Sequence, residues 1–80
     1  MEFCIELSSS LTRGDKKRQC IELEECRPIY AVVDKVIREL KLPVNLENLV
    51  ILTDIGNPVK PEEDACRIHE VVVIKAFSGG

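Results

Sequence analysis

The chain has 80 residues, of which 45% are hydrophobic and 31% are charged, and its formal net charge is −3. These values predict one globular domain over residues 1–80 with a small core. The acidic balance argues against nucleic-acid binding, which needs clustered Lys and Arg. No stretch approaches the length of a membrane span and no charged and apolar leader opens the chain. We therefore expect no membrane association and a cytoplasmic location.

The first part of the chain predicts a β-hairpin. Residues 2–7 and 19–24 both alternate between apolar and polar side chains, and residues 8–15 between them are rich in Ser and contain Gly14. Such alternation is typical of strands with one buried face. The side chains expected on that face are Phe3, Ile5, Leu7, Ile21 and Leu23.

A helix is predicted over residues 28–42. Pro28 suits the first turn of a helix, and Pro43 prevents continuation past Leu42. No good N-cap residue precedes the helix, since Arg27 is a poor one. The apolar positions that recur at helical spacing are Ile29, Val32, Val33, Val36, Ile37 and Leu40.

The remaining elements are short. Residues 49–53 form an apolar strand, Val59 is expected to begin a brief return strand, and residues 61–64 could open a helical turn. Residues 71–77 are an apolar, β-branched run broken only by Lys75, which is typical of a strand in the interior of a sheet.

This order predicts an α+β fold with a mixed sheet of four to five strands and one main helix packed on one face. The most apolar strand, at 71–77, should lie in the middle of the sheet beside the first strand. The two would run parallel, because the helix supplies the crossover connection that parallel neighbours need.

The terminal strand is followed by Ser78, Gly79 and Gly80. Two glycines cannot pack against a core and cost the most entropy to fix. We therefore expect a flexible tail at 78–80 that presents a bare carboxylate outside the fold.

The hairpin–helix–strand order, the turn at 56–59 and the terminal run that ends in Gly79 and Gly80 resemble the ubiquitin-like β-grasp sulfur carriers of thiamine and molybdopterin biosynthesis (ThiS/MoaD-like). The topology is similar over the whole chain, and the specific part is the terminal strand with its diglycine. Residues 67–70 depart from the Asp–Gly–Asp turn that the family often carries before its last strand.

The resemblance implies that the chain is a carrier and not an enzyme. A partner enzyme with ATP and Mg²⁺ would adenylate the carboxylate of Gly80, and a sulfur donor would then displace AMP to leave a thiocarboxylate. The expected partners are this adenylating enzyme and a synthase that accepts the sulfur. The chain itself would bind no cofactor and no metal, and it would be a monomer when free.

Two other functions stay open. A ubiquitin-like modifier would use the same activated carboxylate to join Gly80 to a lysine of a target protein. A β-grasp interaction domain would carry the tail incidentally. Catalysis by a pair formed from Cys66 and His69 lacks a third group to orient the pair.

The four cysteines, Cys4, Cys20, Cys26 and Cys66, have spacings that fit no usual zinc site. In the cytosol we expect them to be free thiols. The hairpin places Cys4 and Cys20 opposite each other, so the redox state of this pair stays open.

Lys75 is charged, so its face of the terminal strand is predicted to point away from the helix. Alternation would then place Val71, Val73 and Phe77 on that outer face and Val72, Ile74 and Ala76 in the core. An exposed apolar face beside the reacting carboxylate predicts a docking surface for the partner enzyme.

Overall fold

The computed structural model describes residues 1–12 and 14–76. They form a small α+β fold with a mixed four-stranded sheet and one main helix, an arrangement compatible with a β-grasp fold. The strands are β1 (Glu2–Leu7), β2 (Lys17–Glu22), β3 (Leu49–Leu52) and β4 (Glu70–Lys75).

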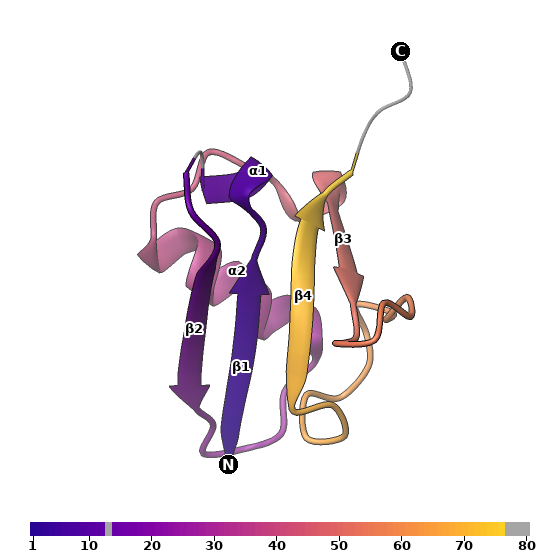
Figure 1. The fold of residues 1–80 in the computed structure, drawn as a ribbon. Coiled ribbons are helices and arrows are strands. Elements are labelled where there is room, and N and C mark those ends of the chain that lie inside the picture. The colour runs from indigo at the N-terminus through magenta and orange to yellow at the C-terminus, as the bar shows by residue number, and fades with distance from the viewer. Residues whose placement is uncertain (13, 77–80) are drawn as a thin grey trace.

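The sheet has the order β2-β1-β4-β3 (Figure 1). Strand β1 pairs antiparallel with β2 and parallel with β4, and β3 pairs antiparallel with β4. The terminal strand therefore lies in the interior of the sheet and runs parallel to the first strand, as the sequence predicted.

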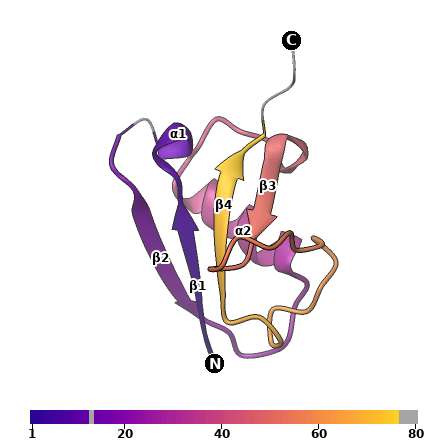
Figure 2. The same ribbon diagram turned by 45° about the vertical axis from the view of Figure 1, so that its right-hand side comes forward.

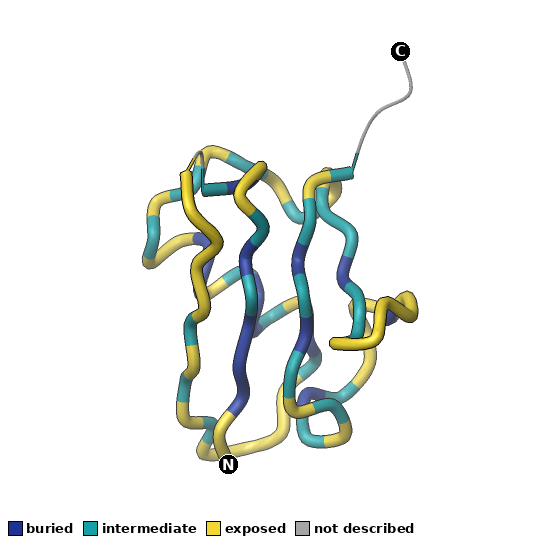
Figure 3. Tube along the Cα trace, viewed as in Figure 1, coloured by how far each residue is buried: buried dark blue, intermediate teal, exposed yellow. Residues whose placement is uncertain are grey.

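The main helix α2 spans Ile29–Glu39 and covers one face of the sheet (Figure 2). Its buried side chains are Ile29, Val32, Val33, Val36 and Ile37, which confirms the predicted stripe. Together with Phe3, Ile5 and Leu7 of β1 and Val71 and Val73 of β4, they make up most of the hydrophobic core. Strand β2, in contrast, is mostly exposed to solvent (Figure 3).

The N-terminus of α2 is capped by backbone groups from a distant segment. The N–H of Ile29 donates to the Glu63 carbonyl at 2.8 Å, and the N–H of Tyr30 donates to the Pro61 carbonyl at 3.0 Å. These bonds satisfy two of the donors that every helix start leaves without an intrahelical partner. This explains how the helix begins although its N-cap residue, Pro28, makes no side-chain hydrogen bond.

The helix ends three residues earlier than predicted. Lys41 has a φ of 54°, in the left-handed region, and its N–H donates to the Arg38 carbonyl at 3.2 Å. The N–H of Leu42 donates to the Ile37 carbonyl at 3.1 Å. This pair of bonds is a Schellman motif, which ends a helix and usually has glycine at the left-handed position.

Two short helices lie in segments that the sequence analysis treated as loops. Helix α1 (Ser9–Thr12) lies in the hairpin connection and buries Leu11, and the 3₁₀ helix η1 (Leu46–Asn48) precedes β3. Both are a single turn, too short to give a periodic apolar pattern.

The predicted return strand and helical turn are smaller than expected. The segment after β3 forms an isolated bridge between Leu52 and Pro58, with the Val59 N–H donating to the Ile51 carbonyl at 2.9 Å. Residues 61–63 form a turn and a bend, Asp64 forms an isolated bridge with Pro28, and none of these residues is helical. Strand β2 also begins and ends two residues earlier than the predicted 19–24.

Candidate functional site

The predicted reacting end of the chain lies outside the described residues. This applies to the carboxylate of Gly80, to Ser78 and Gly79, and to the docking residue Phe77. The last described residue, Ala76, donates its N–H to the Asn48 carbonyl at 2.7 Å. This bond ties the segment that leads into the tail to the residues just before β3.

The predicted outer face of β4 is the buried face. Val71 and Val73 have no exposed surface, so their assignment to a docking surface was wrong. The register shows why: Val71 lies beside Ile5 and Val73 beside Leu7, two core residues of β1. Lys75 shares their side of the strand but is the last residue of β4, where the side chain reaches solvent. A lysine at a strand end therefore does not report which face of the strand is buried.

The other side of β4 carries an apolar surface that does face away from α2. Val72 and Ile74 pair with Leu52 and Val50 of β3, and all four side chains are half-buried. Directly paired residues point to the same face of a sheet. None of the four is among the half-buried residues that pack against the core under α2. We call Val50, Leu52, Val72 and Ile74 the open-face patch.

The open-face patch was not predicted from the sequence, because the two faces of β4 were assigned from Lys75 alone. That residue was taken to mark the face that points away from the helix. Residues 49–52 and 71–74 are both uninterrupted apolar runs. In such a run both the odd-numbered and the even-numbered side chains are apolar, so each face of the strand is apolar whichever one is buried. The two uninterrupted runs were therefore the signal in the sequence for an apolar surface on the outer face.

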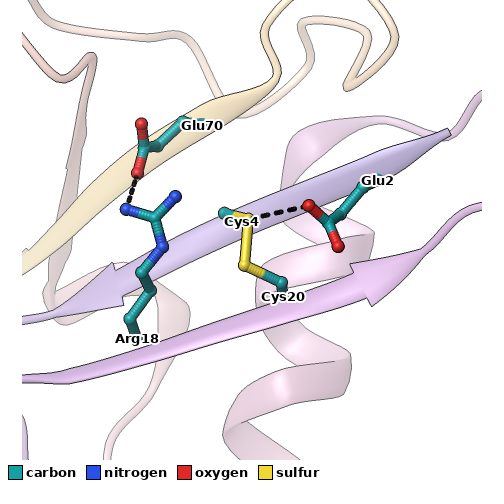
Figure 4. The surroundings of a disulfide bond; sticks show 5 residues. All are labelled: Glu2, Cys4, Arg18, Cys20 and Glu70. Carbon is teal, nitrogen blue, oxygen red and sulfur yellow. Dashed lines mark hydrogen bonds and ion pairs between the residues drawn. A yellow bond between two sulfur atoms is a disulfide. The ribbon is translucent and has the colours of Figure 1, made fainter.

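We call the face of the sheet that points away from α2 the open face. Its half formed by β1 and β2 is polar and carries a disulfide (Figure 4). Cys4 and Cys20, opposite each other as predicted, form a disulfide with a Cα–Cα distance of 4.0 Å. Beside it, Arg18 of β2 reaches across β1 to form an ion pair with Glu70 of β4. The carboxylate of Glu2 lies 3.9 Å from the Cys4 sulfur. The open face is therefore divided into a polar half and an apolar half.

The remaining two cysteines, Cys26 and Cys66, are also joined by a disulfide, with a Cα–Cα distance of 5.4 Å. The prediction of four free thiols is thus wrong. The Ala65 N–H donates to the Arg27 carbonyl at 2.8 Å, next to this bond. The second disulfide therefore fastens the start of α2 to the segment that leads into β4, where the two backbones already pair.

Two groups of possible metal ligands include these cysteines. They are Glu2 with Cys4 and Cys20, and Asp64 with Cys26 and Cys66. A metal is bound by the thiolate, and all four sulfurs are held in disulfides. For the same reason Cys66 has no thiol to act as a nucleophile beside His69. In the disulfide form these groups offer a metal only their carboxylates.

No protein-family model matches the chain, and no curated protein matches it. Within residues 1–12 and 14–76, no helix is long and apolar enough to cross a membrane.

Proposed function

We propose that this chain is a sulfur-carrier protein whose Gly80 carboxylate is adenylated by a partner enzyme and converted to a thiocarboxylate. The observation that carries the proposal is the position of the diglycine. Only residues 76–78 separate it from β4, a strand in the interior of the sheet. Two terminal residues without a Cβ, a short distance along the chain from a rigid strand, suit an acyl group that must enter another protein's active site.

The docking surface in this proposal is the open-face patch. Half-buried valine, leucine and isoleucine side chains on the sheet face opposite α2 are of the kind that protein interfaces bury. Ile74 and its partner Val50 lie nearest to the point where β4 ends, at Lys75. A partner bound there would contact the end of β4, five residues before Gly80 in the sequence.

The chemistry is supplied by the partner. Its ATP and Mg²⁺ would convert the Gly80 carboxylate to an acyl-adenylate with release of pyrophosphate, and sulfide would displace AMP to leave the thiocarboxylate. Where the donor is a persulfide, displacement of AMP would give an acyl disulfide, and a second thiol would reduce its S–S bond to release the thiocarboxylate. The carried sulfur would then pass to an acceptor synthase. The four cysteine sulfurs of this chain take no part in these steps, since they are bonded to one another.

Reconstitution tests the proposal. The purified chain is incubated with ATP, Mg²⁺, a sulfide source and a candidate adenylating enzyme of the ubiquitin-activating type. We expect the chain to gain the mass of one oxygen-to-sulfur exchange, localised to the C-terminal peptide. Deletion of Gly80, and extension by one residue beyond it, should abolish the gain without changing the thermal unfolding. Charging of the extended variant to the native level would refute the proposal.

The modifier and the interaction domain are outcomes of the same experiment. An isopeptide bond between Gly80 and a lysine of a target protein, in place of a released thiocarboxylate, would identify a modifier. Binding of the candidate enzyme through the open-face patch without any change of mass would identify an interaction domain.

A further inference from the structure

Strand β2 lies at one edge of the sheet and has an unpaired side. The Leu23 N–H donates to the Met1 carbonyl at 2.7 Å just beyond the end of the β1–β2 ladder. Antiparallel pairs alternate between hydrogen-bonded and non-hydrogen-bonded, so the odd-numbered residues of β2 bond to β1. The N–H and C=O groups of Arg18, Cys20 and Glu22 therefore point away from the sheet. Among residues 1–12 and 14–76, no strand pairs with them.

A groove of about 850 Å³ lies at the end of this edge, between α2 and the last residues of β2 with the segment that follows them. Its apolar lining includes Ile21, Leu23 and Ala31, and the first two are only half-buried although they point toward the core. A further strand laid beside β2 would pair the free backbone groups and cover these side chains. Strand addition of this kind gains its affinity from main-chain hydrogen bonds.

The charges along the edge indicate which strand fits. Basic residues Lys16 and Arg18 come before Cys20, and acidic residues Glu22 and Glu24 follow it at the same spacing. We propose that a second copy of this chain pairs its own β2 antiparallel to this edge, with the two-fold axis at Cys20. The pairing places Arg18 opposite the partner's Glu22 and Lys16 opposite the partner's Glu24. Two-fold symmetry repeats both pairs.

This register satisfies two independent conditions. Within β2, Arg18 faces the partner's Glu22 and Cys20 faces the partner's Cys20, so their outward backbone groups meet as hydrogen-bonded pairs. Lys16 and Glu24 flank the strand and contribute their side-chain charges. If the partner strand is shifted by two residues in either direction, the backbone hydrogen bonds can still form. Only one kind of opposite-charge pair then remains, either Lys16 with Glu22 or Arg18 with Glu24. Opposite charges on directly paired residues stabilise a sheet, and like charges destabilise it.

The ion pairs within one copy leave the edge available. Arg18 pairs with Glu70 but is 58% exposed, and Glu22 pairs with the Met1 amine but is 72% exposed. The guanidinium has five donors, so Arg18 can bond to Glu70 and to a partner carboxylate together. Within the described residues, Lys16 and Glu24 form no ion pair.

The proposed dimer differs from the monomer expected from the sequence. Charged side chains on an edge strand often prevent it from pairing with another strand. Here the basic pair, Lys16 and Arg18, and the acidic pair, Glu22 and Glu24, face each other when a second copy is related by two-fold rotation. Strand β3 forms the opposite edge of the sheet from β2, and the open-face patch lies on β3 and β4. The proposed dimer therefore leaves the proposed carrier function unobstructed, and each can fail without the other.

Charge reversal at Lys16 and Glu24 tests the dimer. Sedimentation equilibrium should show dimers of the native chain that weaken as salt is raised, because exposed charges are screened. Lys16→Glu alone and Glu24→Lys alone should each weaken the dimer by about tenfold or more, since two symmetric attractions become repulsions. An equimolar mixture of the two variants should form a heterodimer, because every pair is then complementary again.

The matched controls are Lys60→Glu and Glu47→Lys, which make the same charge changes at exposed positions away from β2 and should not alter dimerisation. Circular dichroism verifies that each variant is folded. At a concentration of about 1 mM, a dimer with a Kd of about 1 mM or lower is detected. A native chain that stays monomeric at that concentration would overturn the proposal. So would single variants that dimerise as well as the native chain, or a mixture that does not form heterodimers.

Discussion

Val72 and Val73 are neighbours in the sequence with opposite surroundings. Val73 has no exposed surface and lies under α2, whereas Val72 is half-buried on the open face. The same substitution at the two positions therefore separates folding from binding. Threonine is the suitable replacement, because it keeps the β-branch that strands favour and adds one hydroxyl group.

Val73→Thr should lower the free energy of unfolding by about 1–3 kcal/mol, because it buries a hydroxyl among apolar groups. Val72→Thr should change it by less than about 0.5 kcal/mol, as is usual for surface positions. Urea denaturation measures both. Equal losses would contradict the assignment of the two faces of β4.

Val72→Thr should also weaken binding to the proposed adenylating partner. A substitution at an interface anchor typically costs more than about 1 kcal/mol of binding free energy. Isothermal titration against the partner measures this loss, with Lys60→Glu as a surface control that should bind as the native chain does. An unchanged affinity for Val72→Thr would exclude Val72 from the docking surface.

Lys41 is the other residue with a specific prediction. Its φ of 54° lies in a region where a Cβ crowds the following carbonyl. Lys41→Gly should therefore stabilise the protein by about 0.5–1 kcal/mol and raise the Tm by about 2–8 °C. Lys41→Ala is the control, since it removes the charge but keeps the Cβ. A Tm for Lys41→Gly no higher than that of Lys41→Ala would contradict this account of the helix end.

At the scale of elements, the strands and the helix followed from local patterns. Alternation in 2–7 located β1, and helical spacing from Ile29 to Ile37 located the buried stripe of α2. The placement of β4 beside β1 followed from its apolar character. These patterns are set by burial, which acts on every residue of an element.

What the sequence did not predict depends on tertiary contacts or on redox conditions. The faces of β4 were reversed because both are apolar, and the register with β1 decides between them. The capping of α2 by the carbonyls of Pro61 and Glu63 joins segments about thirty residues apart and has no local signal. The disulfides were missed because the cysteines were assigned to a reducing compartment.

The two disulfides should contribute unequally to stability. The loop-entropy relation gives about 4 kcal/mol for Cys26–Cys66, which closes a separation of 40 residues, and about 3 kcal/mol for Cys4–Cys20, which closes 16. Replacing both members of a pair by serine should lower the Tm more for Cys26–Cys66. Thiol titration of the native protein under non-reducing conditions should find no free thiol. Four reactive thiols would contradict the cross-linked structure.

At the scale of the molecule, the two edges of the sheet have different roles in our account. The edge strand β2 is proposed to meet a second copy of the chain, and β3 and β4 carry the open-face patch, which extends to the end of β4. The two disulfides are relevant to the compartment in which the protein is found. Such bonds persist in oxidising compartments and, as an exception, inside cells of hyperthermophiles. A cytoplasmic location stays a prediction, and it is compatible with two disulfides in a hyperthermophile.

The central claim, that Gly80 carries sulfur, is tested most directly by the intact mass of the protein isolated from its own host. Fragmentation of the C-terminal peptide locates any added mass. We predict a population that ends at Gly80 and is heavier there by one oxygen-to-sulfur exchange. Alkylation of the thiocarboxylate should shift this population to a higher mass. A chain that continues past Gly80, or one that ends there only as an ordinary carboxylate while its pathway is active, would contradict the claim.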